Sequence, residues 1–359
     1  MKKIQQVYTL RMTIVLLFCS VFLVGCAESE LLNGPSVSRS REVQIISDQY
    51  HVPEDKQLIL YTSHKESVYL PIVREFENRT GIWVEIHAGG TTQLLDEVRT
   101  ASEEGACDVM FGGGIASYEA ENDLFMPYTT RESSSIDPRW ISKDGTWTAF
   151  TELPIVFVYN NKLLSGEEAP KGWTDLMENP EYKGRIAFAD PLNSGTGYTV
   201  LATLLQLTGE DKKELIGRFV RQLDGRILSS SGDVIPNVSN GQFLVGITLE
   251  ETAFRYMSED NDISICYPEE GTSAIPDGCA MVKGAPHSYN AGLFIDFVTG
   301  ADTQRYAVEQ YGRRSVRTDI GNGDNFKEIS IIDLDIKSAA REEKEILDIW
   351  KSQTAEAEE

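Results

Sequence analysis

The chain has 359 residues and carries 33 lysine and arginine residues against 56 aspartate and glutamate residues, a formal net charge of −23. Nucleic acid and anionic membrane surfaces attract clustered lysine and arginine, so this excess of acid argues against both as partners. The part of the chain that can fold, about 300 residues, is long enough for two domains of ordinary size.

The first 25 residues have the order of charges that is typical of an export signal. Three basic residues are followed by an almost wholly apolar run, residues 14–24, which is short for a membrane span. The run ends in Gly25 and Cys26, which resembles the lipid-attachment site of bacterial lipoproteins and implies cleavage after Gly25. A plain secretory signal with a chance cysteine, or an uncleaved anchor helix, is the alternative.

We therefore expect a lipoprotein signal in residues 1–25, a lipid anchor on Cys26 and a flexible tether over residues 26–56. Removal of the leader takes away three positive charges and changes the formal charge from −23 to −26. This arrangement predicts an extracytoplasmic protein that is lipid-anchored to the bacterial cell membrane.

From residue 57 onward the pattern alternates between strand and helix. Residues 58–61 and 82–87 read as strands, and residues 68–79 between them read as a helix that ends before Gly81. A helix over residues 93–104 follows, and then a buried strand over residues 108–111. Such alternation predicts an α/β fold with a largely parallel sheet, in which ligands bind at the loops after the strands.

The second half of the chain continues with shorter elements. The predicted strands are residues 155–159, 185–189, 227–228, 243–248, 263–267 and 278–282, and the predicted helices open at residue 173 and cover residues 198–207, 291–298 and 337–351.

Loops with hydroxyl groups and glycines follow several of the predicted strands. Ser194, Gly195 and Thr196 lie between a strand and a helix, where backbone N–H groups and two hydroxyls suit a phosphate or a carboxylate. An ordinary helix cap is the equally plain alternative. Ser230 and Ser231 follow another strand and predict a facing wall of the same anion site, although serine-glycine loops are also common turns.

The first half of the chain offers a second set of candidate ligand-binding residues at its strand ends. These are Ser63 and His64 after the first strand, Thr91 and Thr92 before the second helix, which either threonine could cap, and Gly113 and Gly114 after the third strand. His64 could donate to a ligand oxygen or coordinate iron, and the alternative is a histidine on a surface loop.

No enzyme motif is present: there is no Gly-x-Ser-x-Gly elbow, no phosphate-binding loop with Gly-Lys-Ser/Thr and no His-Glu-x-x-His. We predict no catalytic residue and no cofactor. Besides Cys19 and Cys26, the cysteines are Cys107, Cys266 and Cys279, which are not spaced as a metal site. A Cys266–Cys279 disulfide and buried free thiols both remain open.

Several longer motifs occur in a fixed order. They are residues 60–66 (LYTSHKE), 76–82 (FENRTGI), 108–114 (DVMFGGG), 182–187 (YKGRIA), 190–197 (DPLNSGTG), 267–272 (YPEEGT), 283–286 (KGAP) and 294–297 (FIDF). This series resembles the extracellular solute-binding proteins of ABC importers, in the branch that includes ferric-iron, 2-aminoethylphosphonate and sugar-phosphate binders.

The resemblance implies a two-lobed periplasmic-binding-protein fold of type II, with the ligand cleft between the lobes. We expect lobe 1 in residues 57–150 and 276–325, lobe 2 in residues 151–275, and a C-terminal helix and acidic tail in residues 326–359. It also implies a monomer whose partners are a small anionic solute and an ABC permease in the membrane.

The resemblance also bears on the ligand. Iron-binding members use two adjacent tyrosines after the strand that corresponds to residues 243–248, and this chain has Leu249, Glu250 and Glu251 there. A phosphorylated sugar or a phosphonate is therefore expected, with its phosphoryl group on the hydroxyls of residues 194, 196, 230 and 231, and with Glu250 accepting from ligand hydroxyls or an amine. Ferric iron on His64 and Glu250, and ligand sensing beside a membrane histidine kinase, are the alternatives.

Overall fold

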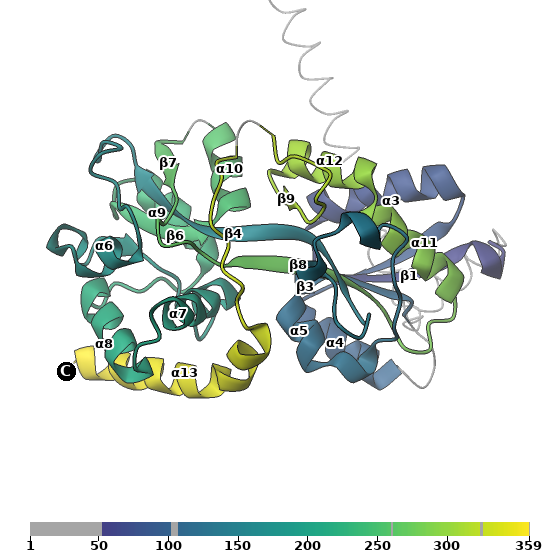
Figure 1. Cartoon of the computed structure of the whole chain (residues 1–359), viewed down its shortest axis with the longest axis horizontal. Coiled ribbons are helices and arrows are strands. Elements are labelled where there is room, and N and C mark those ends of the chain that lie inside the picture. The colour runs from purple at the N-terminus through teal and green to yellow at the C-terminus, as the bar shows by residue number, and fades with distance from the viewer. Residues whose placement is uncertain (1–51, 102–106, 260, 324–325, 359) are drawn as a thin grey trace, which may run out of the picture. The chain divides into compact units, whose positions relative to one another are not determined.

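The computed structural model describes residues 52–101, 107–259, 261–323 and 326–358 (Figure 1). The predicted signal in residues 1–25, the anchor at Cys26 and most of the predicted tether lie outside the described residues. Residues 54–359 form one compact unit. Within the described part of the chain, no helix is long and apolar enough to cross a membrane.

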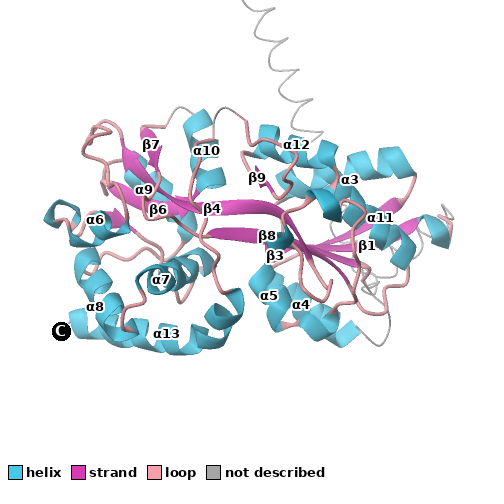
Figure 2. Cartoon of the chain, viewed as in Figure 1, coloured by secondary structure: helices cyan, strands magenta, loops and turns pink. Residues whose placement is uncertain are grey.

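A mixed sheet runs through the molecule in the strand order β2-β1-β3-β8-β4-β6-β5, and β7 and β9 pair with β4 (Figure 2). The strands are β1 (Gln57–Thr62), β2 (Trp83–Ala88), β3 (Val109–Gly114), β4 (Thr148–Asn160), β5 (Ile186–Ala187), β6 (Val245–Leu249), β7 (Ile263–Cys266), β8 (Ala274–Met281) and β9 (Arg314–Ser315). The prediction of an α/β fold is confirmed.

Helices cover both ends of this sheet. The longer ones are α3 (Glu66–Thr80), α4 (Thr91–Ala101), α7 (Gly195–Thr208), α8 (Lys212–Leu223), α10 (Glu250–Ser258), α11 (Ser288–Thr299), α12 (Ala301–Tyr311) and α13 (Ile336–Glu358), and the shorter ones are α5 (Ile115–Ala120), α6 (Trp173–Glu178) and α9 (Val234–Ser239). Short 3-10 helices include η1 (Glu54–Lys56) and η6 (Ser231–Asp233).

The first lobe is built on β1, β2, β3 and the second half of β8. β1 lies between β2 and β3 and is parallel to both, while β3 is antiparallel to β8. One face of α3, which includes Ile72 and Phe76, is buried against this sheet, and Gly81 ends the helix, as predicted, with a φ of 67°. That left-handed conformation is why a glycine stands there.

The second lobe is built on β5, β6, β7 and the second half of β4. β5 is parallel to β6, and β4 is antiparallel to both β6 and β7. Its core holds Phe188 and Phe219 together with Trp350 from the C-terminal helix α13. Ile346 of the same helix is also buried there, whereas Ile349 is only partly buried.

Among the described strands, β4 and β8 extend from one lobe into the other. The first half of β4 pairs with β8, and its second half pairs with β6 and β7, so this single strand of 13 residues joins the two cores. β7 stays beside the second half of β4 and therefore belongs to the second lobe.

The three cysteines of the described chain are free thiols. Cys266 is opposite Phe157 and Cys279 is opposite Thr148, nine positions apart on the same strand β4. Nine residues of strand span about 30 Å, far beyond the reach of a disulfide. The Cys266–Cys279 disulfide is therefore excluded in this fold, and burial raises the pKa of the Cys266 thiol to about 12.

Candidate functional site

The strand register brings the carboxyl ends of both lobes' parallel strands toward the same part of β4. Gly114 at the end of β3 is opposite Asp277, which pairs in turn with Thr151 of β4. Leu249 at the end of β6 is opposite Ile155 of β4. Four residues of strand span about 13 Å, so one small ligand can reach the loops that follow both sets of strands.

The first set of loops, here called the first wall, consists of Ser63, Thr91, Gly113 and Gly114. A Cβ on Gly113 would lie 2.7 Å from Thr91 Cγ2 and 3.3 Å from Ser63 Oγ, so these predicted residues do lie together. Gly113 has a φ of 89° and leaves the room for this close approach. Thr92 is exposed in the first turn of α4, and both threonines belong to the helix instead of preceding it.

His64 is not on the surface, although it follows β1 directly. Its side chain is 5 % exposed and lies against Phe111, with ring centroids 4.4 Å apart. Burial lowers the pKa of His64 to about 4, because the charged imidazolium would lose its hydration. Nε2 lies 3.6 Å from Asp277 Oδ2 and has no hydrogen-bond partner among the described residues.

The reason for this burial lies in the glycine run. Gly112 has a φ of 96°, and a Cβ there would lie 2.8 Å from the imidazole of His64. Glycine at position 112 therefore allows the His64 ring to turn inward beneath the loop. The position of His64 after a strand end does not by itself predict this orientation. In this conformation the predicted contact of His64 with a ligand would require the ring to leave its apolar neighbours.

The second set of loops follows three parallel segments of the second lobe. Ala189, just after β5, pairs in parallel with Leu228, and β5 pairs in parallel with β6. The segments that follow are residues 190–197, residues 229–232 and the start of α10. We call the hydroxyl-bearing part of this edge, residues 194–196 with 230 and 231, the second wall.

Ser194 caps helix α7: its Oγ accepts from Gly197 N at 3.1 Å. The helix-cap interpretation is thus correct for Ser194, but other polar groups of this loop remain available. Gly195 and Thr196 are the first two residues of a 14-residue helix, and N–H groups at that position have no acceptor within the helix. Gly195 is exposed and Thr196 is half-buried, so both can meet a ligand.

Ser230 has a similar local role. It precedes η6, and its Oγ accepts from Gly232 N at 3.1 Å. Ser230 is exposed and Ser231 is half-buried. The backbone pairing Asp190 N to Leu228 O, 2.8 Å, holds the strand ends before the two serine loops together.

Glu250 is already engaged inside the protein. Its Oε2 accepts from Arg314 Nε at 2.6 Å, and its Oε1 accepts from Arg314 Nη2 at 2.9 Å and from Tyr267 Oη at 2.7 Å. The residue is fully buried. Because Glu250 is fully buried and already accepts three hydrogen bonds from the protein, it does not face a ligand, and the role predicted for it does not fit this conformation.

Glu251 is half-buried, and both glutamates open helix α10 instead of ending a strand.

A second buried ion pair lies at the crossing itself, and the sequence pattern did not point to it. Asp277 pairs with Arg313 and also accepts from Thr151 N at 2.8 Å and from Thr151 Oγ1 at 2.6 Å. These residues are far apart in the chain, and the visible signal is the cluster of arginines 313, 314 and 317 in a strongly acidic chain.

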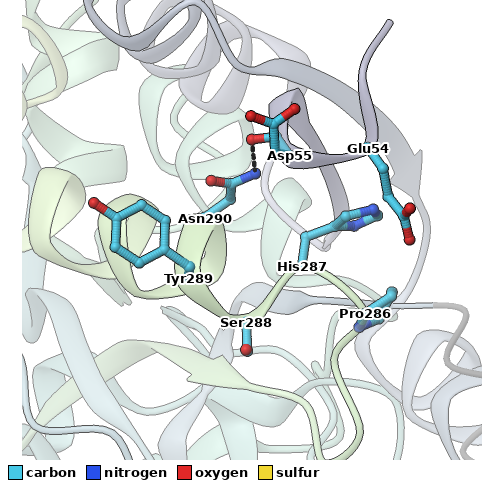
Figure 3. A pocket seen from close by; sticks show the side chains of 7 residues that line it. All are labelled: Glu54, Asp55, Pro286, His287, Ser288, Tyr289 and Asn290. Atoms are coloured by element: carbon cyan, nitrogen blue, oxygen red, sulfur yellow. Dashed lines mark hydrogen bonds between the residues drawn. The ribbon is translucent and has the colours of Figure 1, made fainter.

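The pocket in Figure 3 lies elsewhere. It has a volume of about 510 Å³ and is lined by Glu54, Asp55 and residues 286–290. Asn290 Nδ2 donates to Asp55 O at 3.0 Å and ties the start of α11 to η1. Because η1 precedes β1, this pocket is at the amino end of β1, whereas Ser63 follows the carboxyl end. None of the predicted ligand-binding residues lines it.

Comparison with known proteins identifies the family. The profile of the bacterial extracellular solute-binding proteins matches residues 107–330. The chain belongs to this family. The predicted class, an extracellular solute-binding protein of ABC transport, is therefore confirmed.

Two named relatives carry iron in their names. The Fe(3+)-binding periplasmic protein of Serratia marcescens is 24 % identical over 84 % of this chain and 90 % of its own length. Iron uptake protein A1 of Synechocystis is 24 % identical over 71 % of this chain and 74 % of its own length.

Solved structures show the same fold. The periplasmic binding protein AfuA from Actinobacillus pleuropneumoniae, with fructose-6-phosphate bound, has a TM-score of 0.71 at 24 % identity and covers 83 % of this chain and 98 % of its own. The ferric binding protein from Campylobacter jejuni has a TM-score of 0.72 at 19 % identity, with 82 % and 99 % covered.

Proposed function

We propose that this solute-binding protein captures a small phosphorylated sugar or phosphonate-type anion between its first and second walls and delivers it to an ABC permease. The observation that carries this proposal is the start of α7, where two N–H groups without helical acceptors lie beside the hydroxyls of Ser194 and Thr196. We further propose that Cys26 anchors the protein to the membrane through lipid.

The likeness to AfuA supports this ligand class, since that structure holds fructose-6-phosphate. The residues after β6 support it as well. Iron-binding members of the branch are expected to place adjacent tyrosines there, whereas this chain places Leu249, Glu250 and Glu251. Hydroxyls and backbone N–H groups suit phosphoryl oxygens, and Fe³⁺ is better served by anionic oxygen ligands.

Ferric iron is the second candidate, and the names of the two iron-related relatives favour it. For iron to bind as the sequence suggests, Glu250 would have to leave Arg314 and His64 would have to turn out of its apolar surroundings. Among the described residues, no group of three histidines, cysteines, aspartates or glutamates is already placed to hold a metal ion.

A sensing role is the third candidate. A solved structure described as a two-component system protein that mediates signal transduction has a TM-score of 0.69 at 26 % identity and covers 81 % of this chain and 99 % of its own. Sensing and transport can use the same ligand site, so this alternative concerns the partner in the membrane and not the chemistry of the site.

The proposal predicts that Ser194→Ala combined with Thr196→Ala weakens the binding of fructose 6-phosphate at least tenfold, about 1.4 kcal/mol, in isothermal titration calorimetry. Loss of the Ser194 cap also costs about 1 kcal/mol of stability, so the variant is first shown to be folded by its melting curve.

Thr208→Ala is the matched control, because Thr208 is exposed in the last turn of the same helix. Unchanged affinity in the folded double variant would remove this loop from the binding site.

A further inference from the structure

The first turn of the C-terminal helix α13 touches both lobes. Ile336 packs against the core of the first lobe that contains Ile115 and Tyr118 of α5. Lys337 Nζ forms an ion pair with Glu119 Oε2 of α5 at 3.1 Å. In Figure 1 the helix starts beside α5 and runs along the second lobe to α8.

The rest of α13 is held firmly by the second lobe. Tyr198 in the first turn of α7 donates to Ala339 O, and Lys212 Nζ of α8 pairs with Glu342 at 2.9 Å. Ile346 and Trp350 are buried in the core of that lobe. The residue before the helix is also attached there, since Asp335 N donates to Gln206 Oε1 at 2.8 Å.

The attachments to the two lobes are therefore very unequal. Two buried side chains and several hydrogen bonds fix α13 to the second lobe, so the helix moves with it. The contact with the first lobe rests on the half-buried Ile336 and on Lys337, whose side chain is 68 % exposed. Although Glu119 is only 14 % exposed, an ion pair with one partner in water is weak, so the contact with the first lobe is much weaker than the attachment to the second.

The position of this contact relates it to the ligand site. α5 begins directly after Gly114 of the first wall, and α7 begins directly after Ser194 of the second wall. The first turn of α13 is thus attached to the two helices that carry the walls. We propose that Ile336 and Lys337, together with Glu119, form a latch that limits how far the two walls separate.

This inference rests on the proposed function only in that the two walls form the ligand site. Opening and closing equilibria of two-lobed binding proteins shift with small energies, so a weak contact between lobes is sufficient to change them. Cutting the latch lets the lobes open further, which lowers the population that is ready to close on a ligand.

The test measures the separation of the lobes and needs no ligand. Spin labels are placed at Thr100→Cys in α4 and Glu214→Cys in α8, both exposed, in the full chain purified in detergent with Cys19, Cys26 and Cys266 changed to serine. Pulsed electron paramagnetic resonance then gives the distribution of distances between the lobes. We expect Lys337→Glu and Ile336→Ala each to broaden it and shift it to longer distances.

Lys351→Glu is the matched control, because it makes the same charge change at an exposed position of α13 that lies beyond Trp350. The latch is refuted if both latch variants keep the original distribution, or if the control changes it equally. Because no ligand is present, such a result is separate from any failure of the phosphoryl-group assignment.

Discussion

At the scale of single residues, the buried ion pair between Glu250 and Arg314 is expected to support folding more than ligand binding. Glu250→Gln leaves the guanidinium of Arg314 without its bidentate carboxylate partner. Breaking a buried pair by changing one partner costs about 3 kcal/mol, which chemical denaturation measures directly.

Glu251→Gln is the matched control, since Glu251 is the next residue, is half-buried and takes no part in this ion pair. If both variants unfold at the same denaturant concentration, Glu250 is not holding Arg314 as described. A loss of ligand affinity in Glu250→Gln without loss of stability would return Glu250 to the ligand site.

His64 gives a second prediction at this scale, concerning pH. Burial lowers its pKa from 6.5 to about 4, so the folded state keeps the ring neutral while the unfolded state takes up a proton below pH 6.5. The contribution of His64 is therefore complete above pH 6.5 and is lost as the pH falls toward 4, with about 2 kcal/mol lost by pH 5.

The measurement is the free energy of unfolding at pH 7.5 and pH 5 for the original chain and for His64→Gln. The variant lacks the titrating ring, so its stability should fall by about 2 kcal/mol less over this interval. An equal fall in both proteins would mean that the ring is accessible to protons in the folded state.

At the scale of elements, α13 is expected to be part of the second lobe's core and not a dispensable tail. Trp350 is 1 % exposed, contacts the rings of Phe188 and Phe219, and donates from Nε1 to Asp190 Oδ1 at 3.0 Å. Trp350→Ala should cost about 3–5 kcal/mol of unfolding free energy. Lys351→Ala, one residue further along, should be close to neutral, and a similar loss in both would contradict this packing.

The elements of the first lobe could be predicted from local pattern because each has a clear period and a clear stop. The buried residues of α3 recur at helical spacing, and Gly81 ends the helix. Helix α8 carries the same signals: Asp211 caps it, and its buried residues include Leu215 and Phe219. Helix α10 was missed because Glu250 and Glu251 follow a strand without a break.

The parts that local pattern could not supply are contacts between distant segments. Arg314 and Glu250 are 64 residues apart, and Asp277 meets Thr151 across 126 residues. Neither pairing follows from periodicity, because it depends on the register of β4 with β8 and β9. Likewise, His64 was expected at a strand end, but only the backbone of Gly112 explains why its ring turns inward.

At the scale of the whole molecule, the long strand β4 positions the two halves of the proposed site. β4 joins both cores and brings the carboxyl ends of β3 and β6 within about 13 Å of each other along its length. Loops from both lobes can thereby contribute to the proposed site, which would then change when one lobe moves against the other. The order of the sequence motifs predicted the two-lobed fold. The burial and hydrogen-bond partners of His64 and Glu250 depend on the strand register and could not be predicted in this way.

A thermal-shift screen of the purified chain shows whether the two walls bind a phosphoryl or phosphonyl group. The compounds are fructose 6-phosphate, 2-aminoethylphosphonate, a phosphoglycerate, inorganic phosphate and ferric citrate. A ligand at one hundred times its dissociation constant adds about 2.7 kcal/mol of stability, a readily measured shift. We expect a phosphorylated or phosphonate compound to raise the melting temperature and ferric citrate to leave it unchanged. A rise with ferric citrate alone would contradict a phosphoryl-binding site and would mean that Glu250 and His64 rearrange to bind iron.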